Sequence, residues 1–219
     1  MATISDFATL KAAVAEWLWR TGDSALVARA DTFVQLFEAE FVGDPENRFT
    51  DMEEIDAALI TGAAMPLPDG YLEMRALKVL GAAIGVADQP LDYITPARAA
   101  ILDASQLSTS QAKNYTIRAN QIFLTPQSMA PLGASLELSY YKFTGLSDDA
   151  PTNWLMSGYP NIYLYGALEQ AAIYIDDKSS AAAYLSKRMM AQTKLPVADR
   201  KRKVGAGPLK LTPSTGFRT

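Results

Sequence analysis

The sequence predicts an α+β protein, in which a mainly helical bundle carries a β-rich insertion and ends in an extended C-terminal arm. Apolar residues recur at helical spacing before residue 50 and again after residue 146. Between them, short apolar runs are separated by Gly, Pro, Asn and Asp, which is typical of strands. The predicted parts are an N-terminal helical hairpin (1–50), the insertion (51–145), C-terminal helices that complete the bundle (146–195) and a basic arm (196–219).

The N-terminal hairpin is predicted from helix caps and apolar stripes. Thr3 and Asp6 approximate a capping box for a first helix, and Thr21-Gly22 ends that helix. Asp23 or Ser24 caps a second helix. The short connection predicts that the two helices are antiparallel. The side chains expected to form their intra-chain core share helical spacing and are Trp17, Leu18, Phe33, Phe37 and Phe41.

The insertion is predicted to contain short strands and one short helix. Ala119-Asn120 has the composition of a tight hairpin turn, and Pro96 is placed to begin a helix. The expected strands cover residues 53–60, 63–67, 75–80, 90–95, 114–118, 121–125 and 134–143.

Helices are expected again at 152–157, 160–176 and 178–195, after which Pro196 stops or kinks the chain. The helix that begins at Pro160 places apolar atoms all round its axis. Such a helix is buried on several sides, which suggests that a neighbouring subunit covers one of them. The residues expected at this subunit interface are Trp154, Tyr159, Tyr163, Tyr165 and Gly166.

The chain contains no cysteine and no histidine. This excludes disulfides, Cys-based zinc sites, and Ser-His or Cys-His catalytic pairs. The acids Asp51, Glu53, Glu54 and Asp56 lack the glycine and oxygen spacing of a calcium loop, so we interpret them as a solvated strand face. No phosphate-loop or nucleophile motif is present. We therefore predict no catalytic site, no cofactor and no metal.

The charge of the chain is divided unevenly. From Lys178 onward there are ten Lys or Arg and one acid, or +9, and since the whole chain carries −4, residues 1–177 carry −13. This division predicts electrostatic docking of the C-terminal part on another surface. The cluster Arg200, Lys201, Arg202 and Lys203 could contact phosphate, form a solvated helix end, or dock on an acidic protein.

No apolar run approaches the ~20 residues of a membrane span, and the N-terminus lacks the pattern of a signal peptide. A soluble protein made in the cytoplasm is expected. Residues 205–219 alone would be extended or disordered, although Leu209 and Leu211 alternate as in a strand added to a partner's sheet.

One long motif and several shorter ones follow one another along nearly the whole chain. The longest is LSDDAPTNWLMSGYPNIYLYGALEQAA, residues 146–172. The shorter motifs are LPDGYLEMR (67–75), LDYITP (91–96), YTIRANQI (115–122), LELSYY (136–141) and GPLKL (207–211). In this order they resemble the head–tail adaptor (connector) proteins of short-tailed bacteriophages, whose virions these proteins help to build; this places the host cytoplasm as the site of synthesis. Two departures are Glu169-Gln170, where the family has an aliphatic residue followed by Glu, and Pro196, in a stretch that is usually helical.

The resemblance implies a structural virion protein at the head–tail junction and not an enzyme. It implies a ring, dodecameric in this family, that joins the portal to a tail or nozzle protein. The ring would surround double-stranded DNA without reading its sequence and would form the path for DNA ejection. The residues that the resemblance assigns to portal binding are Arg200, Lys201, Arg202, Lys203, Pro208, Leu209, Lys210 and Leu211.

Two other classes of function stay open at this point. One is a nucleic-acid-binding module that uses the basic tail. The other is a carboxylate-dependent hydrolase, which requires acids that converge in a pocket.

Overall fold

A computed structural model describes residues 4–81, 88–105, 112–127 and 132–204 of the chain. It contains helices and strands, which confirms the predicted α+β class. The chain divides into two compact units. One, Met1–Asp51 together with Gly145–Thr219, is called the helical unit here; the other, Met52–Thr144, is called the β unit.

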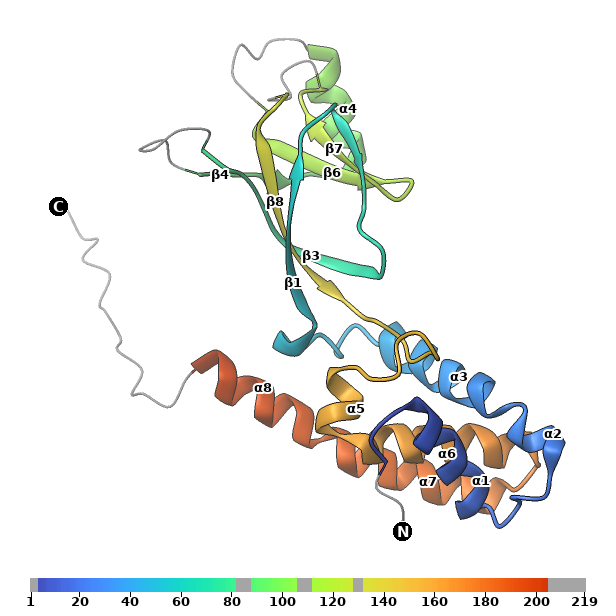
Figure 1. Ribbon diagram of the computed structural model, residues 1–219. Helices are drawn as coiled ribbons and strands as arrows, with labels where there is room; N and C mark the ends of the chain where they lie inside the picture. Colours follow the sequence, from blue (N-terminus) through green and yellow to red (C-terminus); the bar gives the residue numbers. More distant parts are fainter. Residues whose placement is uncertain (1–3, 82–87, 106–111, 128–131, 205–219) are drawn as a thin grey trace. The chain divides into compact units, whose positions relative to one another are not determined.

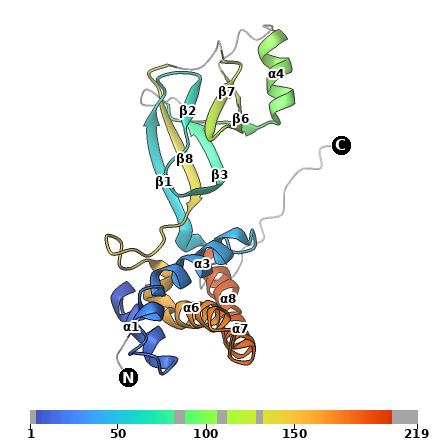
Figure 2. The same cartoon turned by 90° about the vertical axis from the view of Figure 1, so that its right-hand side faces the viewer.

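The helices of the helical unit are α1 (Phe7–Trp17), α2 (Ser24–Val27), α3 (Ala30–Gly43), α5 (Trp154–Gly158), α6 (Pro160–Tyr174), α7 (Lys178–Gln192) and α8 (Lys194–Val204) (Figure 1). The unit is built around α6, which packs against α1, α3, α5 and α7. Figure 2 views α6 and α7 nearly end on and places α1 and α7 on opposite sides of α6.

Helix α1 begins with a capping box one turn later than expected. The Asp6 carboxylate accepts from the Thr9 backbone N–H at 2.8 Å, and the Thr9 hydroxyl oxygen accepts from the Asp6 N–H at 3.0 Å. Thr3 lies outside the described residues. The helix also ends before the expected Thr21-Gly22, because Leu18 is its C-cap and Trp19 reverses the chain in the left-handed region.

The expected second helix is divided into α2 and α3. The carboxylate of Asp23 accepts from the Leu26 N–H and caps α2, while α3 begins at Ala30 without a side-chain cap. Phe33, Phe37 and Phe41 are buried, which confirms them as core residues. Trp17 and Leu18 are half-buried at the edge of that core.

The C-terminal helices differ from the prediction. Helix α7 ends at Gln192, and α8 continues the chain from Lys194 to Val204. Pro196 lies in the first turn of α8, where its missing N–H costs no intrahelical hydrogen bond. The extended arm expected from residue 196 is therefore helical as far as residue 204. The rest of the predicted arm lies outside the described residues.

The β unit contains two four-stranded sheets, ordered β1-β8-β3-β4 and β2-β7-β6-β5, whose buried side chains form one shared core. The hairpin between β6 and β7 turns at Ala119 and Asn120, both at positive φ, as expected. Helix α4 (Pro96–Ser105) confirms the predicted helix after Pro96.

The bounds of the strands follow the predicted ones closely, except that β3 begins earlier and the expected strand 90–95 is two short strands. The strands are β1 (Glu53–Leu59), β2 (Ala64–Pro66), β3 (Tyr71–Val79), β4 (Gln89–Pro90), β5 (Asp92–Tyr93), β6 (Asn114–Arg118), β7 (Gln121–Thr125) and β8 (Ser135–Lys142).

Candidate assembly surfaces

Two residues predicted at a subunit interface are buried inside the helical unit. Tyr163 is fully buried, and a Cβ atom added at Gly166 would overlap the ring of Phe37. The apolar and small residues around α6 are thus explained by helices of the same chain. This corrects the expectation that Tyr163 and Gly166 contact a neighbouring subunit.

The hydroxyl of Tyr163 belongs to a buried polar network. It donates to Glu38 Oε1 at 2.7 Å and accepts from Asn153 Nδ2 at 2.6 Å. The same Glu38 oxygen accepts from the Leu146 N–H at 2.7 Å. Burial raises the pKa of Glu38 although both hydrogen bonds oppose the shift. The network fixes both ends of the segment 146–153 against α3 and α6.

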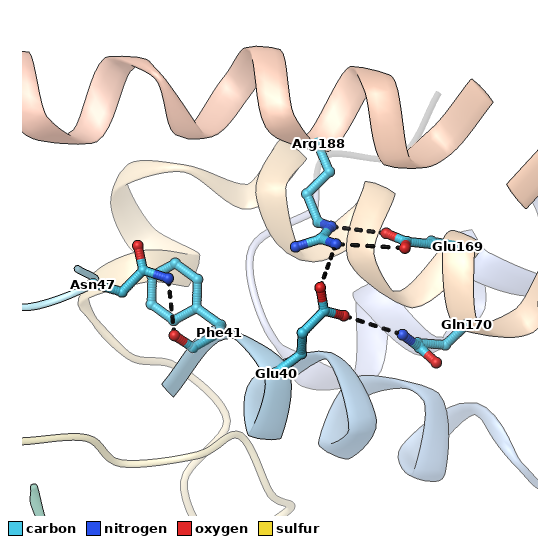
Figure 3. Close-up of polar contacts among 6 residues, drawn as sticks. All are labelled: Glu40, Phe41, Asn47, Glu169, Gln170 and Arg188. Atoms are coloured by element: carbon cyan, nitrogen blue, oxygen red, sulfur yellow. Dashed lines mark hydrogen bonds and ion pairs between the residues drawn. The ribbon is translucent and has the colours of Figure 1, made fainter. Parts of the chain in front are cut away.

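A second network joins α3, α6 and α7 (Figure 3). Arg188 Nε donates to Glu169 Oε2 at 2.8 Å, and Arg188 Nη2 donates to Glu40 Oε1 at 2.7 Å. Gln170 Nε2 lies 3.4 Å from the other oxygen of Glu40. Both residues of the Glu169-Gln170 departure therefore take part in helix packing, and Glu169 supplies the acid that pairs with Arg188.

The other three residues predicted at a subunit interface are half-buried. The ring of Trp154 lies 5.9 Å from that of Phe49. Tyr165 lies edge-on to Trp17 at 6.2 Å. Tyr159 lines a recess with residues of α8. Each of the three has part of its surface available to another chain, so their interface role stays a prediction.

The basic cluster at the end of α8 divides into two pairs. Arg202 forms an ion pair with Asp51, and Lys203 forms one with Asp199 at 2.7 Å. Arg200 and Lys201 are exposed and have no ion pair within the described residues. Arg202 thus holds the helix to Asp51, Lys203 pairs within the helix, and Arg200 and Lys201 are presented to solvent.

Asp199 anchors α8 to the end of the segment that precedes the β unit. Its Oδ1 accepts from the backbone N–H of Thr50 at 2.7 Å and from the Thr50 hydroxyl at 2.6 Å. Burial would raise the pKa of Asp199, but Lys203 and Thr50 outweigh it and hold the pKa below its ordinary value. The chain that follows α8, with the predicted portal-binding residues Pro208, Leu209, Lys210 and Leu211, lies outside the described residues.

Three of the four clustered acids, which are the candidates for a hydrolase or metal site, have separate partners. Asp51 pairs with Arg202, Glu53 with Arg75, and Asp56 accepts from the Tyr140 hydroxyl at 2.5 Å. Within the described ranges, no group of three or more acids is arranged to hold a metal ion.

Sequence reasoning missed two exposed apolar features of the helical unit. Trp19, just beyond α1, is 94% exposed, and Met189 and Met190 on α7 are 57% and 71% exposed. The exposed apolar face of α7 could have been identified from the spacing of Leu185, Met189 and Met190, which places three apolar side chains on one side of the helix. No helix among the described residues is long and apolar enough to cross a bilayer.

Exposed aromatic and methionine side chains are enriched where proteins bind one another. Trp19, Met189 and Met190 therefore give the helical unit surfaces of the kind found on proteins that assemble with others. The sequence model of the family described as SU10 adaptor protein matches residues 5–210, nearly the whole chain. The chain belongs to this family, which confirms the resemblance to phage adaptors and makes it a structural component of the virion. Among curated proteins, no sequence matches the chain.

Proposed function

We propose that this adaptor assembles as a ring, dodecameric as in the related connectors, that joins the portal to the tail of a phage. Double-stranded DNA passes through the ring during ejection without sequence readout. Family membership supports the role at the junction. The net charge of −13 on residues 1–177 supports the role of a channel, because a surface that repels phosphate lets DNA slide.

The attachment site is the end of α8 and the chain that follows it. The observation that carries this assignment is the division of the basic cluster, in which Asp51 and Asp199 hold α8 while Arg200 and Lys201 remain available. The portal, or an adjacent adaptor subunit, receives these two cations together with Pro208, Leu209, Lys210 and Leu211. Charge sets the rate of encounter, and the leucines hold the docked state.

Native mass spectrometry of the chain alone and mixed with the portal protein tests the proposal. The expected result is a complex of a portal ring with a full ring of adaptor subunits. A chain that stays monomeric in the presence of assembled portal would contradict it. A mobility shift with free DNA, lost as salt increases, would instead favour the nucleic-acid-binding alternative.

A further inference from the structure

Trp19 occupies a position that normally favours glycine. The end of α1 is a Schellman motif, in which the Trp19 N–H donates to the Glu16 carbonyl and the Arg20 N–H to the Ala15 carbonyl, both at 3.0 Å. The residue that turns the chain in such a motif lies in the left-handed region, and Trp19 does so at φ 54°. A bulky side chain there is strained, and the indole is 94% exposed. The fold of the single subunit therefore does not bury this side chain, although the backbone conformation at this position would favour glycine.

Strain kept at an exposed aromatic residue indicates a function for that side chain. Tryptophan is the residue type most enriched among interface anchors, because it buries a large rigid surface at a low cost in side-chain entropy. Trp19 is exposed enough to act as such an anchor, and it follows directly on a helix that is packed against α3 and α6.

The outer face of α7 provides a matching hollow. A groove of about 400 Å³ runs along this helix. Its exposed apolar side chains are those of Leu185, Met189 and Met190. Methionine adapts its shape and makes favourable sulfur contacts with aromatic rings. The groove is lined, without any charged residue, by Ala182, Leu185, Ser186, Met189, Met190 and Thr193.

The anchor and the groove lie on opposite sides of the helical unit, because α1 and α7 flank α6 (Figure 2). One subunit cannot join them. A contact between different patches on two copies is heterologous. It forms a closed ring when a whole number of identical rotations from one copy to the next adds up to 360°.

Charges near the two features are complementary. Glu16, one turn before Trp19, has no ion pair within the described part of the chain, whereas Arg20 is already paired with Asp23. Lys194, just beyond the end of α7, likewise has no acid partner among the described residues, whereas Lys187 lies over the rings of Tyr165 and Tyr184 and not in the groove. A neighbouring copy that brings Glu16 toward Lys194 would satisfy both charges.

We propose that Trp19 of one subunit inserts into the α7 groove of the next subunit, and that this contact closes the adaptor ring. The inference rests on the proposed ring and names the surfaces that form it. Trp19 contributes the anchor, Met189 and Met190 form its pocket, and the pair of Glu16 with Lys194 sets the orientation.

The absence of cysteine from the whole chain permits a direct test. Thr21→Cys places a thiol two residues from the anchor, and Ser186→Cys places one in the groove. Adaptor on assembled particles is treated with a short bismaleimide. The expected result is a ladder of covalent multimers from the double variant, dimers from particles that contain both single variants, and no product from either single variant or from the natural chain.

Two results overturn the inference while leaving the ring in place. Dimers formed by one single-cysteine variant alone would show a symmetric contact between like patches. Adaptor rings that are present on particles but give no ladder would show that other surfaces form the contact, or that the groove receives the portal or the chain's own C-terminal residues. If the natural chain forms no ring on the portal at all, the proposed function fails and the inference fails with it.

A substitution at the anchor separates assembly from folding. Trp19→Gly relieves the left-handed strain and should raise the melting temperature of the free subunit. The same variant should weaken ring formation at least about tenfold, as loss of an interface anchor does. The matched control is Tyr93→Ala, which removes an exposed aromatic residue of the β unit and should leave ring formation unchanged. Normal rings from Trp19→Gly would contradict the proposal.

Discussion

The guanidinium of Arg188 lies 2.8 Å from the carboxylate of Glu169, and the two side chains are only 6% and 9% exposed. Each charge is costly to bury alone, and its partner offsets part of that cost. The pair joins α6 to α7, and the half-exposed Glu40 extends it to α3. Removal of either buried partner would leave the other charge buried without compensation where α6 and α7 pack together.

Arg188→Met is expected to lower the free energy of unfolding by about 3–5 kcal/mol, because it leaves Glu169 buried without a partner. Adding Glu169→Leu should restore most of that loss, since no buried charge remains. Urea denaturation of the free subunit measures both. Glu40→Gln, at the exposed end of the network, should cost less than about 1 kcal/mol. Equal losses in the single and double variants would contradict the role of the buried pair.

The packing around α6 leads to a second prediction. Gly166→Leu must displace the ring of Phe37, so it should destabilise the free subunit by about 1–3 kcal/mol. Gly43→Ala is the matched control, because a Cβ there meets no atom within 4 Å. Thermal unfolding of the unassembled chain measures both. If Gly166→Leu unfolds like the natural chain and loses only its assembly, α6 would have to contact another subunit after all.

Local signals in the sequence were sufficient for much of this fold. Pro160 marks the start of α6, and the spacing of Phe33, Phe37 and Phe41 identifies the buried face of α3, because both depend only on neighbours within a few turns. The turn at Ala119-Asn120 is likewise set by its own two residues.

What the sequence did not indicate depends on distant partners. An apolar helix such as α6 shows that it is covered, but not whether its own chain or another covers it, so Tyr163 and Gly166 were assigned to the wrong surface. Arg188 pairs with Glu40, from which it is separated by 148 residues of sequence. Trp19 was missed because a left-handed helix end is usually marked by glycine, and here Gly22 lies three residues away.

Glu38 is expected to make stability depend on pH. Burial raises its pKa above the ordinary value of 4.5, so the folded state holds this proton more tightly than the unfolded state. The resulting contribution is present below the ordinary pKa and is lost as pH rises through the raised value. Glu38→Gln keeps an acceptor oxygen for Leu146 and Tyr163 but cannot ionise.

The natural chain should therefore lose stability relative to Glu38→Gln as pH rises above about 4.5. Asp6 provides a control of opposite sign, because its hydrogen bonds from Thr9 lower its pKa. Relative to Asp6→Asn, the natural chain should lose stability as pH falls. Denaturation between pH 3 and pH 8, roughly the range that spans these carboxyl groups, measures both. A flat difference for Glu38→Gln would show that the carboxylate is solvated.

The last prediction concerns the two available cations of α8. Arg200→Glu together with Lys201→Glu should slow attachment of the adaptor to the portal, and the effect should weaken in high salt, because these exposed charges act on the rate of encounter. The fold should be unaffected, since neither residue has an ion pair among the described residues. Arg202→Glu, by contrast, should also lower stability because it breaks the pair with Asp51.

A control of equal charge is Arg98→Glu together with Lys113→Glu, two exposed cations of the β unit that have no ion pair among the described residues. It changes the net charge by the same amount, so an equal effect on attachment would show a response to overall charge and not to this site.

Deletion of residues 205–219 should leave a folded subunit that reaches the portal at a normal rate but dissociates quickly, because the anchoring leucines Leu209 and Leu211 are lost. Surface plasmon resonance on immobilised portal separates the two rates. Heads that retain adaptor and tail with this deletion would remove the arm from the mechanism and leave α8 itself as the attachment site.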